Sequence, residues 1–238
     1  MAWRERTNLL VGDENLNKLS SAHVLIAGLG GVGAYAAELI ARSGVGEMTI
    51  IDADVVSESN INRQLPALHS TIGQYKADLL SDRIKDVNPD IKLNVVKEFL
   101  KGDNIAELLE KHKYDYVVDA IDTLAPKVFL LYEAYKRNIP LVSSMGAGAK
   151  VDPTQVEIVD ISKSYNCKLA FYVRKRLHRL GVRKGFKVVF SPERLDRKCF
   201  YIDESEQNKL SVVGTVSYMP PVFGCHLASV AIRDLIGI

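Results

Sequence analysis

The sequence is poor in cysteine, and its three cysteines form no recognisable framework. Cys167, Cys199 and Cys225 are scattered along 238 residues. Their odd number argues against a set of disulfide bonds and favours a reducing compartment. The absence of a CxxC pair excludes a structural zinc site of that type. Cys225 stands at the start of an apolar helical run, and we expect it to be a small buried core residue.

Long hydrophobic runs and an excess of one charge are also missing. No stretch approaches the ~18 consecutive apolar residues that a membrane span needs. The N-terminal segment MAWRERTNLL has no apolar core of the length found in signal peptides. The 31 basic and 29 acidic residues leave a net charge of +2, which excludes a generally basic nucleic-acid coat protein but not a local basic patch. These absences predict a cytoplasmic globular protein without a membrane span.

Short apolar runs alternate with amphipathic segments over the first half of the chain. The runs predict strands at 22–27, 48–52, 91–96, 114–122 and 139–144. The segments between them predict helices at 31–43, 73–87, 103–111 and 125–138. This alternation is typical of an α/β fold: a doubly wound, mostly parallel Rossmann-like sheet with helices on both faces.

The second half is less regular, and we interpret it as a C-terminal extension of the same domain. It predicts strands at 155–161 and 186–191, helices at 166–180 and 222–236, and an exposed acidic loop at 201–211. We therefore predict a single domain over 1–238. Its nucleotide-binding core would cover 1–145, and the extension at 146–238 would face the substrate.

A glycine-rich loop follows the first predicted strand and opens the first predicted helix. The sequence GLGGVG satisfies G-x-G-x-x-G through Gly28, Gly30 and Gly33, with Gly31 in addition. Such glycines let the backbone approach a phosphate at a helix N-terminus. Asp52 ends the second strand, where a carboxylate can accept hydrogen bonds from both ribose hydroxyls. The pattern predicts nucleotide binding, whereas the alternative is a tight strand-to-helix turn without a ligand.

The next polar residues distinguish between two kinds of nucleotide site. Asn60, Arg63 and Gln64 are clustered, and Lys76 follows on the next helix. A redox enzyme that uses NAD holds a pyrophosphate on backbone amides and needs few cations. A site that cleaves a triphosphate must offset more negative charge, which arginine and lysine can do. The cluster therefore favours ATP, although each cation taken alone could be a solvated surface charge.

Two aspartates flank the end of the fourth predicted strand. Asp119 and Asp122 lie where ligands bind in open α/β sheets, outside the carboxyl ends of the strands. Asp122 is placed to hold a Mg²⁺ ion that bridges phosphates. Asp119 has two open interpretations, a functional carboxylate or a structural one.

A strongly basic segment lies in the predicted extension. Residues 161–192 contain no acidic residue, and 168–187 hold eight lysines and arginines. Such a segment attracts nucleic-acid phosphates with a salt-sensitive affinity. A solvated cationic helix face and a site for an acidic protein are the alternatives. The candidate RNA-binding residues are Arg174, Lys175, Arg176, Arg179, Arg183 and Lys184.

Taken in order, GLGGVG, IDADVVSESNINRQ, Lys76 and DAIDT resemble the motifs of the ubiquitin-activating-enzyme-like adenylyltransferases. This family includes the enzymes that activate sulfur-carrier proteins for thiamin and molybdopterin synthesis. The resemblance implies ATP, Mg²⁺ and adenylation of a substrate carboxylate. The resemblance implies that Asp52 binds the ribose and that Asp122 binds the Mg²⁺ ion. It also implies that the phosphates are contacted by Asn60, Arg63, Gln64 and Lys76.

Further segments resemble one branch of this family, the bacterial tRNA threonylcarbamoyladenosine dehydratases. They are AWRERTNLLVG, INRQLPAL, VDAIDTLAPK, GAGAKVDPTQVEIVDISKS and VVFSPE. The resemblance implies an enzyme that uses ATP to cyclise a threonylcarbamoyl side chain on tRNA with loss of water. It also implies a homodimer in which Arg6 reaches the ATP of the neighbouring subunit. A cysteine-desulfurase or sulfur-acceptor system is a further partner that the resemblance leaves open.

The chain departs from its relatives in its cysteines. Carrier-activating relatives usually have zinc-binding CxxC pairs, and some dehydratases have a cysteine in a C-terminal loop. Here VGTVSYMPPVFG has none, so we predict no thiol catalysis. Activation of a small sulfur-carrier protein remains the alternative function, and a catalytically silent binding scaffold is a further one.

Overall fold

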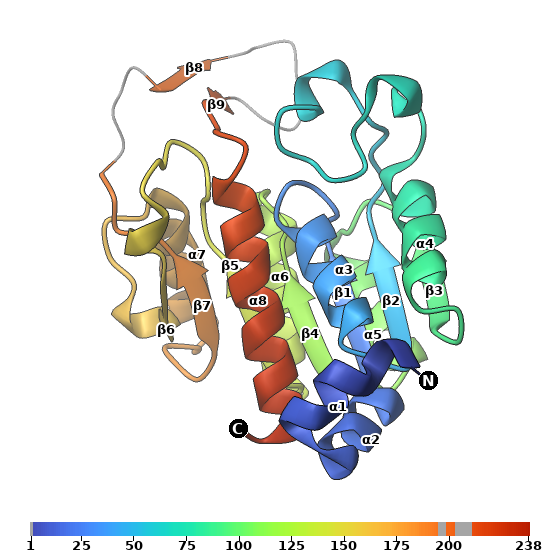
Figure 1. The fold of residues 1–238 in the computed structure, drawn as a ribbon. Coiled ribbons are helices and arrows are strands. Elements are labelled where there is room, and N and C mark those ends of the chain that lie inside the picture. Colours follow the sequence, from blue (N-terminus) through green and yellow to red (C-terminus); the bar gives the residue numbers. More distant parts are fainter. Residues whose placement is uncertain (1, 195–198, 203–210) are drawn as a thin grey trace.

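The central element is a twisted sheet of seven strands in the order β3-β2-β1-β4-β5-β7-β6 (Figure 1). The computed structural model describes residues 2–194, 199–202 and 211–238. Neighbouring strands pair in parallel, except that β6 runs antiparallel to β7. The strands of this sheet are β1 (His23–Ala27), β2 (Glu47–Ile51), β3 (Lys92–Val96), β4 (Tyr116–Asp119), β5 (Leu141–Ser144), β6 (Glu157–Asp160) and β7 (Lys187–Phe190). The predicted doubly wound, mostly parallel α/β fold is confirmed.

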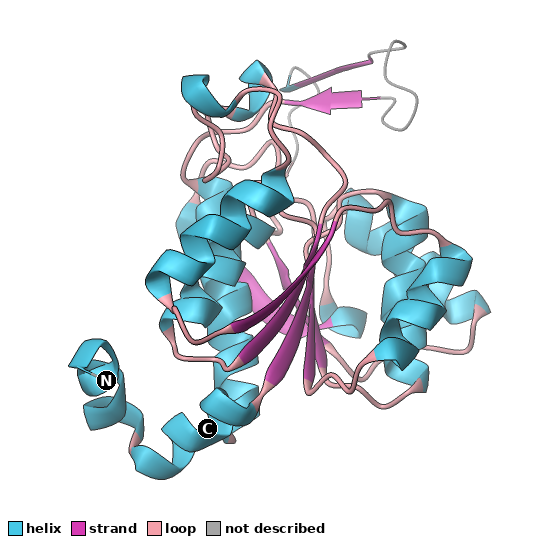
Figure 2. Cartoon of the chain, turned by 90° about the vertical axis from the view of Figure 1, so that its right-hand side faces the viewer, coloured by secondary structure: helices cyan, strands magenta, loops and turns pink. Residues whose placement is uncertain are grey.

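Helices cover both faces of the sheet, as Figure 2 shows edge-on. One face carries α3 (Gly33–Arg42), α4 (Lys76–Val87) and α8 (Met219–Ile236). The other carries α5 (Gly102–Lys111), α6 (Leu124–Lys136) and α7 (Lys168–Arg179). Each matches a predicted helix to within a few residues. Because helices cover both faces, a central strand such as β1 is buried on both sides. This agrees with its sequence, which is apolar along its whole length after His23.

The two sides of the strands contribute to two hydrophobic cores. Val24 and Ile26 of β1 pack under α3 and α8, whereas Leu25 and Ala27 pack under α5 and α6. Strand β7 pairs with β5, and α8 packs against α3, so both predicted parts of the chain share one sheet. The functional division at residue 145 stays a prediction.

Two short N-terminal helices were not predicted. They are α1 (Glu5–Val11) and α2 (Asp13–Ser21), and they lie at the amino-terminal edge of the sheet. The Nη1 of Arg4 donates to Ser20 Oγ at 2.8 Å, which ties the start of α1 to the end of α2. Helix α1 buries no residue, so it shows no apolar periodicity from which it could be predicted.

Two expectations for the C-terminal part were wrong. The predicted loop at 201–211 is replaced at its ends by β8 (Phe200–Ile202) and β9 (Ser211–Val213), which pair antiparallel, and its middle lies outside the described residues. Cys225 is exposed rather than buried. Helix α8 directs Phe223, Gly224 and Leu227 inward, and this leaves position 225 on its outer side.

No described helix combines the length and the apolar character that crossing a membrane requires.

The carboxyl-terminal edge of the sheet gathers the loops that carry the predicted motifs. Gly28 follows β1, Asp52 follows β2, Asp122 follows β4 and Met145 follows β5. The long segment 52–75, cyan to teal in Figure 1, and the hairpin of β8 and β9 lie over this edge. The opposite edge carries α1 and α2.

Candidate nucleotide site and basic surface

The glycine-rich loop turns sharply between β1 and α3. Gly28 has φ of +88°, and a Cβ atom there would lie 2.8 Å from the Ala120 carbonyl oxygen. A Cβ atom on Gly33 would lie 1.8 Å from the Gly28 carbonyl oxygen, and one on Gly31 would lie 2.9 Å from Pro220 Cβ. The fold itself therefore requires glycine at these three positions.

Gly30 differs from the other three glycines. It is not among the described residues with positive φ, and a Cβ atom there would meet only Gln64 Nε2, at 3.7 Å. No contact within the described protein requires a glycine at this position. A ligand that approaches the backbone closely would require one, as a phosphate does at a glycine-rich loop.

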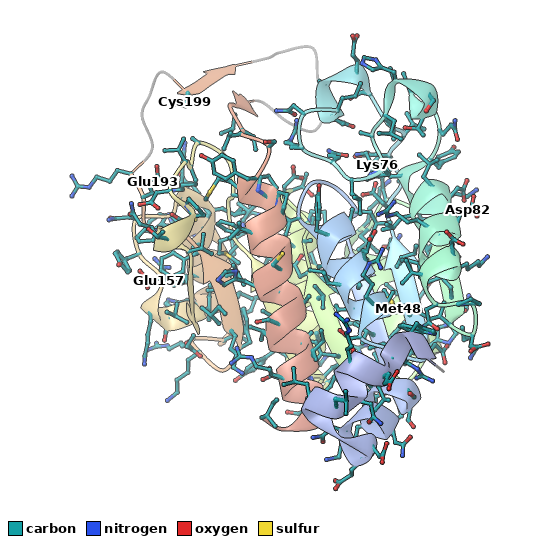
Figure 3. The ribbon with its side chains drawn as sticks, viewed as in Figure 1. Met48, Lys76, Asp82, Glu157, Glu193 and Cys199 are labelled. Atoms are coloured by element: carbon teal, nitrogen blue, oxygen red, sulfur yellow. The ribbon has the colours of Figure 1, made fainter. Side chains whose placement is uncertain are left out.

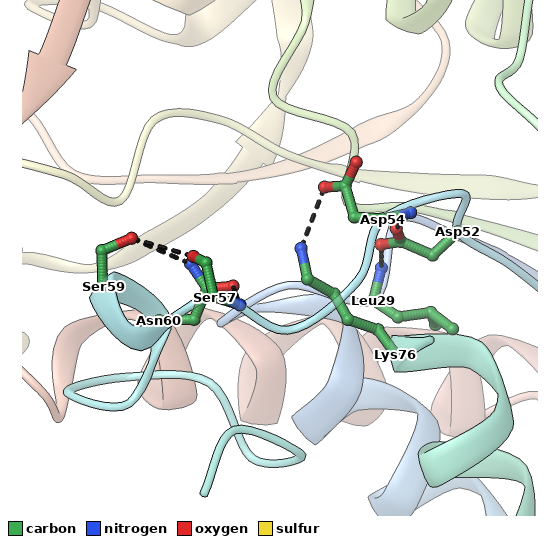
Figure 4. Close-up of polar contacts among 7 residues, drawn as sticks. All are labelled: Leu29, Asp52, Asp54, Ser57, Ser59, Asn60 and Lys76. Atoms are coloured by element: carbon green, nitrogen blue, oxygen red, sulfur yellow. Dashed lines mark hydrogen bonds and ion pairs between the residues drawn. The ribbon is translucent and has the colours of Figure 1, made fainter. Parts of the chain in front are cut away.

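Asp52 connects the glycine-rich loop to the segment after β2. Its Oδ2 accepts a hydrogen bond from the Leu29 backbone N–H at 2.6 Å, and its Oδ1 accepts one from Asp54 N at 2.8 Å (Figure 4). Burial raises the pKa of the Asp52 carboxyl, and the positive charge of Lys76 partly offsets this effect. The carboxylate is thus fixed beside the glycine-rich loop.

Lys76 is the first residue of α4 and is buried at the same edge (Figure 3). Its Nζ lies 2.9 Å from Asp54 Oδ2, an ion pair drawn in Figure 4. The Asp54 side chain is about half exposed, so the lysine is held by a partner at the rim of the site. Asp54 was not predicted, although it stands two residues after Asp52 in the same motif.

The buried amides of the motif are Asn60 and Gln64, and Gln64 lies beside the glycine-rich loop. Asn60 is buried, and its Oδ1 accepts from the Ser57 backbone N–H at 3.2 Å. Gln64 is also buried, and its Oε1 has no hydrogen-bond partner among the described residues. An unpaired buried amide oxygen is costly unless a bound molecule satisfies it. Gln64 therefore marks a place for a polar ligand beside Gly30.

Arg63 is half-buried within the segment that follows β2. Its Nη1 donates to the Ser59 carbonyl oxygen and to Asn62 Oδ1, both at 2.8 Å. Burial lowers the pKa of the Arg63 guanidinium, and the nearby Asp122 carboxylate acts in the opposite direction. The structure therefore brings Arg63 and Asp122 into the same electrostatic environment, with Asp122 itself exposed.

The contacts of Asp119 favour the structural interpretation of this carboxylate. It is completely buried, and its Oδ2 accepts hydrogen bonds at 2.5 Å from Lys127 Nζ and from Ser143 Oγ. Lys127 also donates to the Ile121 carbonyl oxygen at 2.8 Å. The pair holds the turn that leads to Asp122. Sequence reasoning missed Lys127, because nothing in its helix distinguishes it from a solvated lysine.

Arg6 lies far from the other residues predicted for the nucleotide site. It is exposed on α1, at the amino-terminal edge of the sheet, whereas Gly28 follows the carboxyl end of β1 (Figure 1). Leu9 and Leu10 on the same helix are 81% and 86% exposed. Within one chain, Arg6 and the glycine-rich loop are therefore not brought together.

The basic segment forms helix α7 and the turn after it. Lys175, Arg176, Arg179, Arg183 and Lys184 are exposed. Arg174 differs, since it is half-buried and its Nη1 donates to Ser164 Oγ. Val173 and Leu177 face the core, which leaves Phe171 and Tyr172 exposed beside the cations. A groove of about 330 Å³ lies between α6 and α7, with Phe129, Arg176 and Arg179 in its lining.

A comparison with models of protein families shows which family the chain belongs to. A model of the ThiF family matches residues 4–238. The chain belongs to the ThiF family. The match covers the basic segment and α8 as well as the glycine-rich loop, so the family pattern continues through both halves of the chain.

Individual ThiF-family proteins are similar over almost the same length. A tRNA threonylcarbamoyladenosine dehydratase from Bacillus subtilis (strain 168) is 41% identical over 238 residues, with 97% of this chain and 93% of that protein covered. The crystal structure of E. coli tRNA N6-threonylcarbamoyladenosine dehydratase in complex with ATP has a TM-score of 0.89 and 36% identity, and covers 99% of this chain and 96% of that one.

A more distant relative tests the alternative function. The molybdopterin-synthase adenylyltransferase of Escherichia coli (strain K12) is 34% identical over 149 residues, with 63% of this chain and 59% of that protein covered. This similarity leaves out a larger part of both chains than the similarity to the dehydratases does.

Proposed function

We propose that this ThiF-family chain is an ATP-dependent tRNA threonylcarbamoyladenosine dehydratase. It adenylates the carboxylate of threonylcarbamoyladenosine in tRNA and promotes loss of water to give the cyclic form. The similarity to the dehydratases over nearly the full length of both chains supports this assignment of substrate. Since ATP and tRNA are its substrates, we place the protein in the cytoplasm.

The arrangement of residues around Gly30 is the main structural support for an ATP site. The backbone at Gly30 is open to a close approach, and the unpaired Oε1 of buried Gln64 lies in the same region. Lys76 and Arg63 supply positive charge, and Asp52 supplies a carboxylate for the ribose. Asn60 fixes the turn that carries Arg63 and Gln64. These residues fit a nucleotide that carries several phosphates.

The donor set also fits Mg²⁺. The exposed Asp122 offers oxygen ligands at the edge where the phosphates would lie, and Mg²⁺ is usually held by one or two carboxylates together with substrate phosphates. When bound, the ion would neutralise charge on the phosphate oxygens. Arg63 lies near enough to Asp122 for the carboxylate to oppose the lowering of the guanidinium pKa by burial, so both groups would act on the same phosphates.

The chemistry follows from the poor leaving group of a carboxylate. The substrate carboxylate oxygen attacks the α-phosphorus of ATP, the bond to the bridging oxygen breaks, and pyrophosphate leaves. Negative charge develops on the bridging and terminal oxygens, and Arg63 and Lys76 stabilise it. A preorganised donor of this kind typically contributes about 10²–10³-fold in rate. The product is a mixed anhydride with a stabilised phosphate as its leaving group.

Ring closure needs no nucleophile from the protein. A nucleophilic atom of the same modified side chain attacks the activated carbonyl carbon, and AMP leaves with one of the former carboxylate oxygens. Because this attack is intramolecular, orientation supplies much of the catalysis. Cys225 lies on the outer side of α8, and partial desolvation by neighbouring atoms raises the pKa of its thiol, so it has no part in this scheme.

The surface formed by α7 is the proposed tRNA-binding surface. Five exposed cations, Lys175, Arg176, Arg179, Arg183 and Lys184, would contact phosphates. Phe171 and Tyr172 are exposed among them, where they can stack on unpaired bases. Arg174 contributes differently, since its contact with Ser164 anchors the helix.

The groove between α6 and α7 continues this surface toward the nucleotide site. Ala125 lines the groove and belongs to the first turn of α6, which follows directly after Asp122. A tRNA bound along α7 would thus reach the site of adenylation.

The exposed leucines of α1 support a homodimer. Leu9 and Leu10 would be covered by a second copy, and the exposed Arg6 beside them would reach the nucleotide of that copy. This arrangement accounts for the position of Arg6 far from its own glycine-rich loop. A cysteine-desulfurase or sulfur-acceptor partner stays a prediction.

Pyrophosphate exchange tests the proposed reaction against its alternative. The protein is incubated with ATP, Mg²⁺, labelled pyrophosphate and tRNA that contains threonylcarbamoyladenosine. Label should enter ATP only with the modified tRNA, and tRNA that lacks the modification is the matched control. Exchange that depends instead on a small carrier protein would favour the sulfur-carrier adenylyltransferase function.

A further inference from the structure

A second cluster of ligand-type side chains lies at the edge of the sheet opposite the nucleotide site. His23, Glu47 and His112 each present one nitrogen or oxygen atom, and these atoms all lie within 4.8 Å of one another. His23 and Glu47 are the first residues of β1 and β2, and His112 follows α5 directly. None of these residues is used in the proposed reaction.

The sheet register explains how the cluster forms. Parallel pairing of β1 and β2 places His23 directly beside Glu47, so both side chains point to the same face. That face is covered by α5, and the end of this helix brings His112 to it. The rings of His23 and His112 meet edge to face with their centroids 5.5 Å apart. Three separate elements therefore hold the donors.

The contacts of His23 leave one nitrogen directed at the carboxylate. His23 Nε2 lies 2.8 Å from Thr49 Oγ1, whereas Nδ1 lies 3.5 Å from Glu47 Oε1. In a neutral imidazole one ring nitrogen carries the proton and the other carries a lone pair. When Nε2–H donates to Thr49, that lone pair is on Nδ1. An outer hydrogen bond of this kind orients metal-binding histidines.

Tyr114 provides an independent observation. Its side chain is 5% exposed, and its hydroxyl group makes no hydrogen bond of normal geometry with the described residues, although Thr49 is close enough to act on it as a polar neighbour. Its ring centroid lies 4.5 Å from that of His23 and 5.9 Å from that of His112. Glu47 is close enough for its charge to act on the hydroxyl group. A water molecule on a bound ion would give this buried hydroxyl group a partner.

One feature opposes a bound cation. Glu47 Oε1 already accepts from Lys92 Nζ at 2.9 Å and from Asn94 Nδ2 at 3.0 Å. The Lys92 side chain is 69% exposed, however, and its ammonium group can move into solvent at little cost. Lys92 is therefore a competitor whose removal should strengthen cation binding.

We propose that His23, Glu47 and His112 bind one divalent transition-metal ion, for which Zn²⁺ is the best match. Two imidazoles and one carboxylate are a donor set that Zn²⁺ takes at about 2.0–2.2 Å, with water in the fourth position. The ion would connect β1, β2 and the end of α5. This site is independent of the proposed function, because it lies at the other edge of the sheet.

Titration of the full-length protein with Zn²⁺ tests the site, followed by calorimetry and by competition with a chromophoric chelator. The protein should bind one equivalent, and Co²⁺ should give the intense visible absorption of a four-coordinate ion. Glu47→Gln and His112→Asn should each weaken binding at least tenfold. His69→Asn, which changes an exposed histidine outside the cluster, is the matched control and should bind normally.

Lys92→Ala distinguishes a metal site from a simple ion-pair network. Removal of the competing ammonium should tighten Zn²⁺ binding several-fold and leave folding intact, because Lys92 is exposed. The proposal is overturned if the native protein binds no stoichiometric Zn²⁺. It is equally overturned if Glu47→Gln and His112→Asn, shown to be folded by circular dichroism, bind as tightly as the native chain.

Discussion

The ammonium group of Lys127 lies 2.5 Å from a carboxylate oxygen of Asp119, and both side chains are completely buried. Asp119 ends β4, and Lys127 lies on the first turn of α6. The pair therefore closes the turn that contains Asp122. The backbone of Ile121, inside this turn, forms a hydrogen bond with each partner. Its N–H donates to Asp119 at 3.1 Å, and its carbonyl oxygen accepts from Lys127.

Removal of one partner should leave a buried charge without compensation. We predict that Lys127→Met lowers the free energy of unfolding by about 3–5 kcal/mol. Urea denaturation followed by circular dichroism measures this change. Lys136→Met, at an exposed position of the same helix, is the control and should change stability by less than about 0.5 kcal/mol. A Lys127→Met variant as stable as this control would contradict the structural role of the pair.

The cations of the nucleotide site should affect the reaction rather than the fold. We predict that Arg63→Ala and Lys76→Ala each reduce ATP turnover by at least about 10²-fold, because each removes a donor that stabilises the departing pyrophosphate. Steady-state release of pyrophosphate measures the effect, and thermal unfolding checks the fold. Lys85→Ala changes an exposed residue of α4 and should retain full turnover. Unchanged turnover in either site variant would refute its assigned role.

The sequence could predict that these residues lie close together, because they belong to short motifs. Gly28, Asp52 and Lys76 each stand at a fixed place relative to the end of a strand or the start of a helix. The parallel topology then brings these places to one edge. Such local signals can be recognised without knowledge of the tertiary structure.

Other features depend on contacts between distant parts of the chain. The partner of Asp119 could not be predicted, since Lys127 has an ordinary place in its helix and only packing buries it. The burial of Cys225 was predicted wrongly, because the run around it is apolar nearly all round and does not show which side faces the sheet. The cluster of His23, Glu47 and His112 depends on the register of two strands.

Charge reversal on α7 should separate tRNA binding from ATP binding. We predict that the combined change Lys175→Glu, Arg176→Glu and Arg179→Glu weakens tRNA binding at least tenfold and leaves ATP affinity unchanged. For every phosphate that the variant no longer neutralises, the slope of log affinity against log salt should become shallower by roughly 0.7–0.9. Filter binding at several salt concentrations measures both effects.

Arg174 is left out of this combination because its contact with Ser164 belongs to the fold. Reversal of Lys101, Lys111 and Lys113, exposed cations outside the basic segment, provides a control with the same change in charge. If the α7 variant keeps full tRNA affinity, the tRNA-binding surface lies elsewhere.

The proposed role of Arg6 requires two copies of the chain. We predict that Arg6→Ala and Lys76→Ala are each nearly inactive alone, but regain activity when their subunits are mixed and exchanged. A mixed dimer would contain one site with an intact Lys76 and the partner's intact Arg6. Random pairing should restore about a quarter of native activity. A mixture no more active than its components would show that Arg6 does not act across the dimer.

The fate of the carboxylate oxygens tests the central claim most directly. The threonylcarbamoyl carboxylate of the tRNA is labelled with ¹⁸O, and the products are analysed by mass spectrometry after one turnover. Attack on the α-phosphorus followed by ring closure predicts one labelled oxygen in AMP, none in pyrophosphate, and a nucleoside that has lost one water. Cyclised nucleoside with label in inorganic phosphate, or with unlabelled AMP, would contradict activation by adenylation.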